Sequence, residues 1–324
     1  MIASRFTEDE FIELWQRYKS ATAVARVMGV DIRGVHERRR RIESKRGVLL
    51  EAESGVRPTI VKEGAQHELT VAAGNVVVFS DVHRWPGDRP SLAETGLLHV
   101  LDTLPNLKAV VCNGDLFDGA RVSRHGPTEW MDLPNVADEL EACQAFMTQI
   151  EERVPDDVPL LWNAGNHDSR FSVKISTHLP ELAGVHGTDL KDHFSDRWSM
   201  AWSTMVNARS VGGACLIKHR FRGGIHATWN NTLHAGVSTV TGHLHQCKVT
   251  PITDINGRRW GVDTGTLSRF KGEAKFGYTE NNPVNWAEGF AVLTWDHEGR
   301  MAPPSLAEVT GDVCWFRGEA IASE

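Results

Sequence analysis

Five times along this chain, a short hydrophobic run that is typical of a buried strand ends in an aspartate, asparagine or histidine. In chain order the runs and their endings are VVVFSDVH (76–83), AVVCNGD (109–115), LLWNAGNHD (160–168), CLIKH (215–219) and STVTGHLH (238–245). In sheets with parallel strands, ligands bind in the crevice beyond the carboxyl ends of the strands. The recurrence therefore predicts an α/β fold whose strands deliver polar side chains to one edge.

The residues at these strand ends are of the kinds that bind divalent metal ions. In an extended chain residues i and i+2 project to the same side, so Asp81 with His83, and His243 with His245, can reach toward one point. Carboxylate and amide oxygens mixed with imidazoles, without thiolates, suit Mn²⁺, Fe, Zn²⁺ or Ni²⁺. The set is too large for one ion and suffices for two ions that share one aspartate.

The bulk composition is that of a globular protein, and the length suits one large domain or one large domain with a small one. The chain has 324 residues, of which 41% are hydrophobic. No run approaches the roughly 18 apolar residues of a membrane span, and the start MIASRFTEDEF lacks the apolar core of a signal peptide. Five cysteines without a CxxC pair indicate reduced thiols. We therefore expect a cytoplasmic protein that does not enter a membrane.

The beginning of the chain differs in charge from the rest. Residues 1–46 hold 11 Lys and Arg against 7 Asp and Glu, whereas the whole chain has a net charge of −7. The hydrophobic pattern of this segment predicts three short helices, with Thr7 as the N-cap of the first. The helices are expected over 8–19, 21–29 and 32–44. This difference in charge indicates that the chain has two parts with different roles.

The basic helices resemble a nucleic-acid-binding module. The spacing of Ala25, Gly29 and Val35 resembles that of helix-turn-helix proteins, although Arg38 stands where a third apolar anchor is common. The resemblance implies contacts to phosphates or to a groove, most simply of DNA, by Arg33, Arg38, Arg39, Arg40 and Arg41. The alternative is a three-helix module with a solvated arginine face, which the acids on the same helix favour.

The order of the strand-end motifs is more specific than any one of them. The series DxH, GDxxD, GNHD, a single H and GHxH resembles the calcineurin-like metallophosphoesterase family over residues 75–295. The run WGVDTGTL at 260–267 is similar to the strand and glycine turn that commonly follow GHxH in that family. The resemblance implies an α/β four-layer sandwich of two mixed β-sheets flanked by helices.

The domain boundaries follow from these two resemblances. We expect a basic helical domain at 1–50 and a metallophosphoesterase domain at 75–324. The polar, glycine-dotted segment 51–74 is expected to be a linker, with a hairpin around Gly55 and an extended run at 68–71.

The family resemblance assigns the metal ligands residue by residue. It implies a first ion held by Asp81, His83 and His245. It implies a second ion held by Asn166, His219 and His243, with Asp115 bridging both ions. We expect Mn²⁺ first, with Fe, Zn²⁺ and Ni²⁺ as alternatives. Because His219 lacks a motif of its own, His226 stays an alternative ligand and His234 a more remote one.

The same resemblance assigns catalytic roles. His167 is expected to face the substrate as an imidazolium that protonates the leaving group, with Asp118 orienting it. Asn166 and the bridging Asp115 are expected to act at the reacting phosphate, and Asp168 to hold a turn. Two ions lower the pKa of a shared water, so that hydroxide attacks phosphorus in line. The resemblance thus implies a metal-dependent phosphoester hydrolase.

The class of phosphoester is less constrained. Gly119 follows GDxxD where phosphoprotein phosphatases of the family carry an arginine, which argues against that activity. Arg121, Arg124 and Arg170 could bind a polyanion, or could be solvated side chains and an internal ion pair. With the basic helices, they favour a phosphodiesterase or nuclease acting on nucleic acid. The alternatives are a phosphomonoesterase or small-nucleotide phosphodiesterase whose helical module binds a protein, and a DNA-binding regulator with a vestigial metal site.

Further features bear on the substrate and the source. Four tryptophans near the motif loops could stack on bases, although packing is the simpler role: Trp85, Trp130, Trp162 and Trp286. The chain resembles proteins encoded by tailed bacteriophages in three features taken together: the helical module, the run GDLFDGARVSRHGPTEW and the run YTENNPVNWAEGFAVLTW. That resemblance implies the cytoplasm of a bacterium or of a phage-infected host. DNA or RNA, endo- or exonucleolytic cleavage, and any oligomeric state stay compatible with the sequence.

Overall fold

The chain divides into two compact units, Met1–Val56 and Arg57–Glu324. The computed structural model describes residues 6–48, 50, 60–63, 66–126, 131–280 and 282–323. Each unit has its own hydrophobic core.

The described part of the first unit contains the three predicted helices, α1 (Glu8–Tyr18), α2 (Ala21–Met28) and α3 (Ile32–Arg46). Thr7 caps α1 through a capping box with Glu10. Gly29 ends α2 with a φ of 63°, a left-handed conformation that costs glycine little. The core consists of Phe11, Trp15, Val24, Ala25, Val35, Ile42 and Leu50. Apolar residues on one face of each helix thus hold this small unit together.

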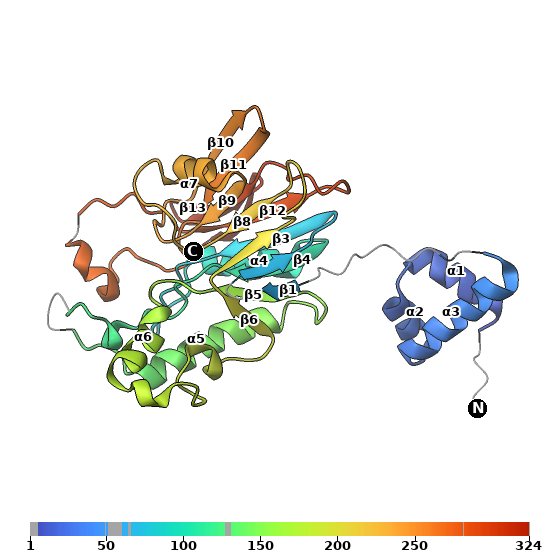
Figure 1. Cartoon of the computed structure of the whole chain (residues 1–324), viewed down its shortest axis with the longest axis horizontal. Coiled ribbons are helices and arrows are strands. Elements are labelled where there is room, and N and C mark those ends of the chain that lie inside the picture. Colours follow the sequence, from blue (N-terminus) through green and yellow to red (C-terminus); the bar gives the residue numbers. More distant parts are fainter. Residues whose placement is uncertain are drawn as a thin grey trace. The chain divides into compact units, whose positions relative to one another are not determined.

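The second unit is built on two mixed sheets (Figure 1). Within the described residues, the first sheet has seven strands in the order β1 (Ile60–Glu63), β2 (Gln66–Leu69), β7 (Ser203–Val206), β8 (Cys215–Ile217), β9 (Ser238–Thr241), β11 (Gly257–Asp263) and β10 (Lys248–Asp254). Strands β8, β9 and β11 run parallel, so their carboxyl ends lie at one edge.

The second sheet has eight strands in the same described ranges. Their order is β15 (Glu319–Ser323), β14 (Val313–Phe316), β13 (Ser305–Thr310), β12 (Gly289–Trp295), β3 (Gly74–Phe79), β4 (Leu107–Cys112), β5 (Leu160–Asn163) and β6 (Trp198–Ala201). Strands β3 to β6 are parallel, whereas β12 to β15 pair antiparallel with their neighbours. The parallel half therefore brings the ends of β3, β4 and β5 together.

Helices cover the outer faces of both sheets, so the predicted four-layer sandwich is confirmed. The helices α4 (Leu92–Thr103) and α5 (Val136–Glu151) pack on the second sheet, and α7 (Ala227–Ala235) packs on the first. Figure 1 shows α5 and α7 on opposite sides of the sandwich. The remaining short elements are α6 (Ser169–His178) and the 3₁₀ turns η1 (Ala120–Val122), η2 (Pro180–Leu182), η3 (Leu190–His193) and η4 (Ala274–Thr279).

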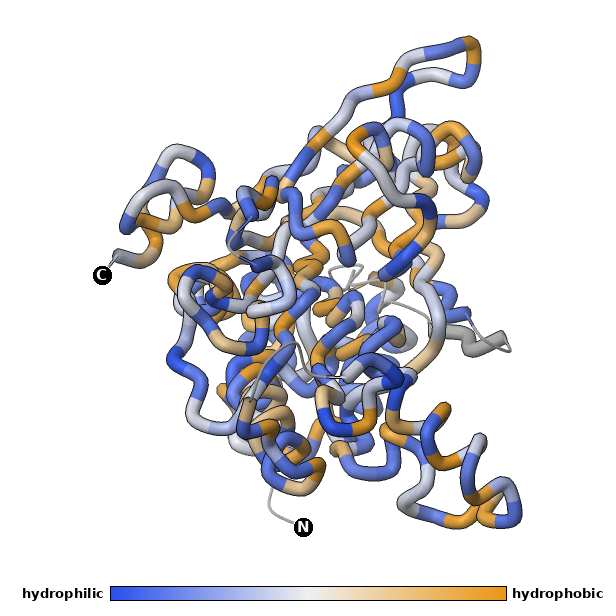
Figure 2. Tube along the Cα trace, turned by 90° about the vertical axis from the view of Figure 1, so that its left-hand side faces the viewer, coloured by the Kyte–Doolittle hydropathy of each residue, from blue (hydrophilic) through white to orange (hydrophobic). Residues whose placement is uncertain are grey.

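Strand β3 shows why the core has two layers. Val76 and Val78 lie in the core between the sheets, whereas Val77 and Phe79 pack toward the helices on the outer face. Successive strand residues point to opposite faces, so a strand that is buried on both faces is apolar throughout. Figure 2 shows hydrophobic and hydrophilic segments alternating along much of the chain, as expected of elements that each bury one face.

Part of the segment that was predicted to be a linker belongs to the first sheet. Residues 60–63 and 66–69 form strands β1 and β2 at its edge, where β2 pairs in parallel with β7 and overlaps the extended run predicted at 68–71. His67 and Leu69 are buried and alternate with more exposed residues. Such a short alternation is hard to distinguish from a polar loop in the sequence. The hairpin predicted around Gly55 lies outside the described residues.

The cysteines agree with the sequence-based expectation. All five are free and buried. Burial raises the pKa of each thiol well above its ordinary value, which makes them packing residues rather than nucleophiles. None of the described helices is long and apolar enough to cross a membrane.

Candidate metal centre

The five strand ends predicted from the sequence converge on one place. Asp81 and His83 follow β3, Asp115 follows β4, and Asn166 follows β5, all in the second sheet. The first sheet contributes His219 after β8, and His243 and His245 after β9. The centre therefore lies where the carboxyl ends of strands from both sheets meet.

The side chains come close enough to hold metal ions. Among the described residues, three groups place their ligand atoms within 4.8 Å of one another. The groups are Asp81, His83 and His245; His83, Asp115 and His167; and Asp115, His219 and His243. Asp115 and His83 each belong to two of these groups. Of the two residues, Asp115 has the two carboxylate oxygens that a ligand shared by two ions requires.

The backbone at the centre is strained. Positive φ angles occur at Asp81 (56°), His83 (43°), Asp115 (54°), His243 (71°) and His245 (56°). Such left-handed residues are uncommon outside glycine and cluster at functional sites. We predicted that Asp81 and His83 converge because an extended chain places i and i+2 on one side. The prediction of convergence holds, but the cause is a pair of left-handed turns rather than an extended backbone.

Asp81 is held as an ionised carboxylate. Its Oδ1 lies 2.9 Å from His245 Nε2, and its Oδ2 accepts hydrogen bonds from the His243 N–H at 2.9 Å and from the Ser80 hydroxyl. Burial acts to raise the pKa of Asp81, but the charges of His245 and His219 outweigh burial and hold that pKa well below its ordinary value. The group is thus a ready anionic ligand.

Asp115 is ionised for a similar reason. Its Oδ1 accepts the His167 N–H at 2.8 Å, and its Oδ2 lies 3.0 Å from His219 Nε2. Burial opposes ionisation, yet the charge and proximity of His219 lower the pKa of Asp115 far below the ordinary range. Both carboxylates that the metal roles require are therefore charged within a buried site.

The same negative field acts on the histidines. Burial would lower the pKa of His83, but the hydrogen bond with Asp118 and the nearby carboxylate of Asp81 raise it to about 10. His219 is likewise raised to about 9 against the effect of burial, chiefly by Asp115. A divalent cation bound there competes with these protons, because a metal-ligating histidine must be neutral. The carboxylates thus create a site that attracts positive charge.

Hydrogen bonds donated by Nδ1 orient two of the histidine rings. His83 Nδ1 lies 3.1 Å from Asp118 Oδ1, and His219 Nδ1 lies 2.7 Å from the Asn113 carbonyl oxygen. Each contact leaves Nε2 as the atom directed at the centre, an arrangement typical of metal-ligating histidines. His83 Nε2 is 3.8 Å from Asp81 Oδ1 and 4.0 Å from Asp115 Oδ2.

Buried polar atoms without a partner test whether metal ions fit. His83 Nε2, His219 Nε2 and Asn166 Oδ1 are buried and make no hydrogen bond within the described residues. His219 Nε2 is near Asp115 Oδ2 but lacks the alignment of a hydrogen bond. A buried polar atom left unsatisfied costs about 1–3 kcal/mol. Cations at the centre would satisfy all three atoms, so the residues present fit a pair of divalent ions.

Asp118 links the metal centre to His167. Its Oδ1 lies 2.8 Å from His167 Nδ1, and its Oδ2 accepts the Trp85 indole N–H at 3.0 Å. Arg170 donates to the Asp118 carbonyl oxygen at 2.8 Å and lies 3.0 Å from His167 Nε2. Because arginine is only a donor, His167 Nε2 is an acceptor and its proton resides on Nδ1.

The surroundings of His167 also affect its charge. Burial, and then the charge of His83, lower the pKa of His167 below its ordinary value. The neutral ring is therefore favoured in the free protein. Arg170, which the sequence offered as a substrate-binding residue, contacts His167 directly.

Asp168 holds the loops together, as expected of a turn-holding acid. Its carboxylate accepts the N–H groups of Asp115 at 2.9 Å, Phe117 at 3.0 Å and Gly165 at 2.8 Å. It also accepts the Trp162 indole N–H at 3.1 Å. Trp162 is fully buried, so the suggestion that it stacks on a base is wrong.

The remaining candidates lie elsewhere. His226 is exposed at the start of α7 and His234 is exposed within that helix, whereas His219 lies in the metal cluster. Arg121 donates to the carbonyl oxygens of Pro134 and Leu133 and does not join the cluster. Trp130 lies outside the described residues.

Two of the five arginines predicted to bind nucleic acid pack inside the helical unit. The Arg38 guanidinium lies 5.3 Å from the centroid of the Phe11 ring and donates to the Phe6 carbonyl oxygen. Arg39 lies 4.7 Å from the Trp15 ring and pairs with Glu43 at 2.9 Å. Cation–π packing explains why an arginine occupies an anchor position. Arg33, Arg40 and Arg41 are exposed on α3.

Several supporting residues were missed by the sequence reasoning. The Thr266 hydroxyl donates to the Asp81 carbonyl oxygen at 2.6 Å, and Ser80 lies 2.6 Å from the Thr264 hydroxyl. The run WGVDTGTL predicted a strand and a glycine turn at this segment but did not predict these contacts. The ring of Trp286 lies 4.5 Å from that of His245, and Phe276 lies 5.8 Å from His83. Aromatic rings thus shield the side of the centre formed by these histidines.

Two cavities lie beside His167. A cavity of about 490 Å³ contains Asn166 and six basic side chains: Arg124, His125, Arg170, Lys174, His178 and Arg220. A cavity of about 450 Å³ contains Asp118 and His167 with Trp85, Tyr278, Met131, Leu133 and Lys275. The two share Ser123, His125 and Arg170 as a common wall. We refer to them as the basic cavity and the aromatic cavity.

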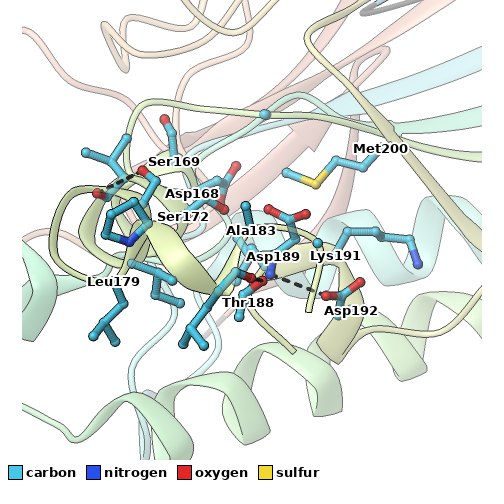
Figure 3. A pocket seen from close by; sticks show the side chains of 18 of the residues that line it. Asp168, Ser169, Ser172, Leu179, Ala183, Thr188, Asp189, Lys191, Asp192 and Met200 are labelled. Carbon is cyan, nitrogen blue, oxygen red and sulfur yellow. Dashed lines mark hydrogen bonds between the residues drawn. The ribbon is translucent and has the colours of Figure 1, made fainter. Parts of the chain in front are cut away.

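A third and larger cavity lies apart from this chemistry. It measures about 940 Å³ and is lined by residues of α6 and the segments that follow, including Leu179, Asp189 and Met200 (Figure 3). None of the residues that line it is a candidate metal ligand. It shares Ser169 and Val173 of α6 with the basic cavity.

The chain is similar to a known protein family in sequence and to solved proteins in structure. The sequence model of the calcineurin-like phosphoesterase family matches residues 74–259. Among solved structures, the chain is similar to Vps29 of Entamoeba histolytica in complex with Zn²⁺, with 10% identity, a TM-score of 0.38, and coverage of 76% of this chain and 99% of that one. Vps29 of Chaetomium thermophilum gives 9% identity, a TM-score of 0.39, and coverage of 78% and 97%.

No curated protein sequence matches the chain significantly. The family match spans more than half of the chain and contains the ends of β3, β4, β5, β8 and β9, from which every candidate metal ligand comes. The chain therefore belongs to the calcineurin-like phosphoesterase family.

Proposed function

We propose that this protein is a two-metal phosphodiesterase, most simply a nuclease, that acts on nucleic acid. The observation that carries the proposal is the position of Asp115, which is shared by two ligand groups at the meeting point of the two sheets. A carboxylate shared in this way suits a pair of ions rather than one. Membership of the phosphoesterase family supports hydrolysis of a phosphoester at this centre.

The metal ions would be held by the residues already described. Asp81, His83 and His245 suit one ion, and Asn166, His219 and His243 suit the other, with Asp115 between them. When bound, such ions supply hydroxide near neutral pH and neutralise charge on the phosphoryl group. We propose Mn²⁺ as the native ion, because mixed carboxylate, amide and imidazole ligands suit it, with Fe, Zn²⁺ and Ni²⁺ as alternatives.

The residues around the ions position the ester. Asn166 offers Oδ1 to the centre and its amide N–H₂ to a phosphoryl oxygen. Arg170 offers a guanidinium, and it already contacts the ring that faces the substrate. An entering phosphate raises the pKa of the neutral His167, because negative charge nearby favours the imidazolium. His167, held by Asp118, can then protonate the departing oxygen.

Nucleic acid is proposed as the substrate because positive charge gathers in two places. The basic cavity borders Asn166 of the centre. On α3, the exposed Arg33, Arg40 and Arg41 suit a phosphate backbone. We propose that the helical unit acts as a helix-turn-helix module that brings the enzyme to DNA. A bacterial cytoplasm, or that of a phage-infected host, is the location we propose.

The proposal is tested with purified protein, Mn²⁺ and end-labelled single- and double-stranded DNA. Shortened products are expected from the wild type, and their ladder separates endonucleolytic from exonucleolytic cutting. The variant Asp115→Asn is expected to give none, whereas Asp157→Asn removes an exposed acid and should cut like the wild type.

A small phosphate ester tests the alternative function. Intact DNA, together with hydrolysis of p-nitrophenyl phosphate by the same preparation, would reject the nuclease assignment. That result would support the alternative, a phosphomonoesterase or small-nucleotide phosphodiesterase whose helical unit binds a protein partner.

A further inference from the structure

The basic cavity is lined by positive side chains, although the chain as a whole is acidic. Six of its lining side chains can carry positive charge, and none of the lining residues is an aspartate or glutamate. The whole chain, by contrast, has 42 Asp and Glu against 35 Lys and Arg. An acid-free basic cavity in an acidic protein favours an anionic ligand, because the summed field there is positive.

The cavity is built by the same loops that build the metal centre. Arg170, Lys174 and His178 are spaced four residues apart on α6, so they lie along one face of that helix. This helix begins directly after the GNHD motif. Arg220 directly follows the candidate ligand His219. The positive side chains are therefore fixed in position relative to the reacting phosphate.

Asn166 connects the cavity to the chemistry. It lines the basic cavity, and its Oδ1 is one of the buried atoms that lack a hydrogen-bond partner. An ester bound at the ions thus has its neighbouring groups at the mouth of the basic cavity. The volume of about 490 Å³ lies within the range of roughly 300–1,000 Å³ that is typical of ligand pockets.

Among the described residues, only one of the six cations has a competing acid: Arg170, which is engaged with Asp118 and His167. Arg124 contacts His125, and His178 contacts the Lys174 carbonyl oxygen. Within the described part of the chain, the side chains of Lys174 and Arg220 make no hydrogen bond or ion pair, and both are exposed. Lys174 and Arg220 therefore have all their donors left for a ligand.

The aromatic cavity differs from the basic cavity in its lining, and the difference indicates which part of a substrate each cavity would bind. It contains the Asp118 carboxylate together with the rings of Trp85 and Tyr278, and its Lys275 already pairs with Asp88. The rings suit a sugar and base rather than an anion. The basic cavity, which has no carboxylate in its lining, is therefore the one that suits a phosphate.

We infer that the basic cavity binds a second phosphate of the substrate, so that the enzyme selects a phosphodiester that has another phosphate as its neighbour along a strand. This inference rests on the proposed phosphodiesterase function and adds a substrate class to it. A nucleic-acid strand meets the requirement, whereas a simple phosphomonoester or an isolated phosphodiester does not. Lys174 and Arg220 are the positioning residues for that second phosphate.

The test compares three dithymidine substrates in Mn²⁺: TpT, and the same dinucleotide with an added phosphate at its 5′ or its 3′ end. For the wild type, an added phosphate at one end is expected to lower KM by about tenfold or more, as charge-assisted hydrogen bonds do. In the double variant Lys174→Ala/Arg220→Ala, that advantage should shrink to about twofold or less. The matched variant Arg209→Ala, which removes an exposed charge outside the cavity, should keep the wild-type ratio of KM values.

The outcomes separate this inference from the function on which it rests. Hydrolysis of all three substrates with equal KM overturns the inference and leaves the phosphodiesterase intact. An advantage that survives in the double variant overturns it as well. Failure to hydrolyse any of the three rejects the proposed phosphodiesterase itself. Because both substituted side chains are exposed, the melting temperature is expected to stay unchanged, which separates lost binding from lost folding.

Discussion

Asp118 and His167 form a hydrogen-bonded pair in which one carboxylate oxygen serves two rings. Asp118 Oδ1 lies 2.8 Å from His167 Nδ1 and 3.1 Å from His83 Nδ1. The same oxygen thus orients the ring of His167, which we propose faces the substrate, and the ring of His83, a candidate metal ligand. We therefore expect chemistry and metal binding to be coupled through this single group.

The variant Asp118→Asn should therefore lower both kcat and metal affinity. We expect each to fall by about 10- to 100-fold, the usual cost of removing a partner that orients a metal ligand. Steady-state kinetics and metal titration of the same preparation measure the two quantities. Trp85→Phe, which removes only the donor to Asp118 Oδ2, is the milder comparison. A normal metal affinity in Asp118→Asn would contradict the shared role.

Asp115→Asn should remove more metal than substitution of any other ligand. Asp115 belongs to two ligand groups, and its ionised carboxylate is held by His219 and by the His167 N–H. Neutralising it weakens both positions, so we expect metal affinity to fall by at least about 100-fold and the bound metal per chain to drop. Elemental analysis after gel filtration gives the stoichiometry, and retention of two ions would show that Asp115 does not bridge.

Gly165 is required because it touches Asp115. A Cβ at this position would lie 2.0 Å from Asp115 Oδ1 and 2.3 Å from its backbone nitrogen. Gly165→Ala must therefore displace the bridging aspartate, and we expect a stability loss of about 1–3 kcal/mol together with loss of metal binding. Gly223→Ala meets no atom within 4 Å and should be neutral in both assays. Thermal unfolding and metal titration of the two variants decide the matter.

The strand-end chemistry could be predicted from the sequence because it is local. Each hydrophobic run ends in a short motif, and the parallel pairing of β3, β4 and β5 brings these motifs together. Thr7 and Gly29 likewise marked the limits of helices through their own side chains or lack of one. These features depend on residues that are neighbours along the chain.

Features set by distant contacts could not be predicted. His219 and His226 are equivalent as single histidines, and only the tertiary fold places His219 in the cluster. Arg38 packs on Phe11, which lies 27 positions away in the sequence. Because a contact over that distance is not visible in the sequence, the sequence indicated only that Arg38 could contact nucleic acid. The extended run predicted at 68–71 overlaps β2, but its place in the sheet was not predicted, because its pairing partner β7 is remote in the sequence. In each case the deciding partner is remote in sequence.

Glu139 should make the stability of the second unit depend on pH. Burial, and then the charge of Asp118, raise the pKa of Glu139 to about 8, although the Gly119 N–H opposes this by donating to it at 2.6 Å. In the unfolded chain its pKa is about 4.3. Since the folded pKa is the higher one, stability is fully present below about pH 4 and is lost as pH rises toward 8.

The variant Glu139→Gln removes this dependence and keeps an acceptor for the Gly119 N–H. We expect it to match the wild type near pH 4.5 and to be more stable by roughly 1–3 kcal/mol at pH 8.5. Glu141→Gln, on the exposed face of the same helix, should show no such change. Urea unfolding at the two pH values measures the difference, and an equal effect at both would refute the assignment.

The arginines of α3 should separate into a structural and a DNA-binding group. Arg38 packs on Phe11 within the core of the helical unit, so Arg38→Ala should destabilise that unit by about 1 kcal/mol through lost cation–π and apolar contact. Arg40→Ala/Arg41→Ala removes exposed charges and should leave folding unchanged. If both bind phosphates, the slope of log affinity for DNA against log salt falls by about 0.9 for each lost contact. Fluorescence anisotropy with labelled DNA at several salt concentrations measures the slope. An unchanged slope in the double variant would mean that this face of α3 does not bind DNA.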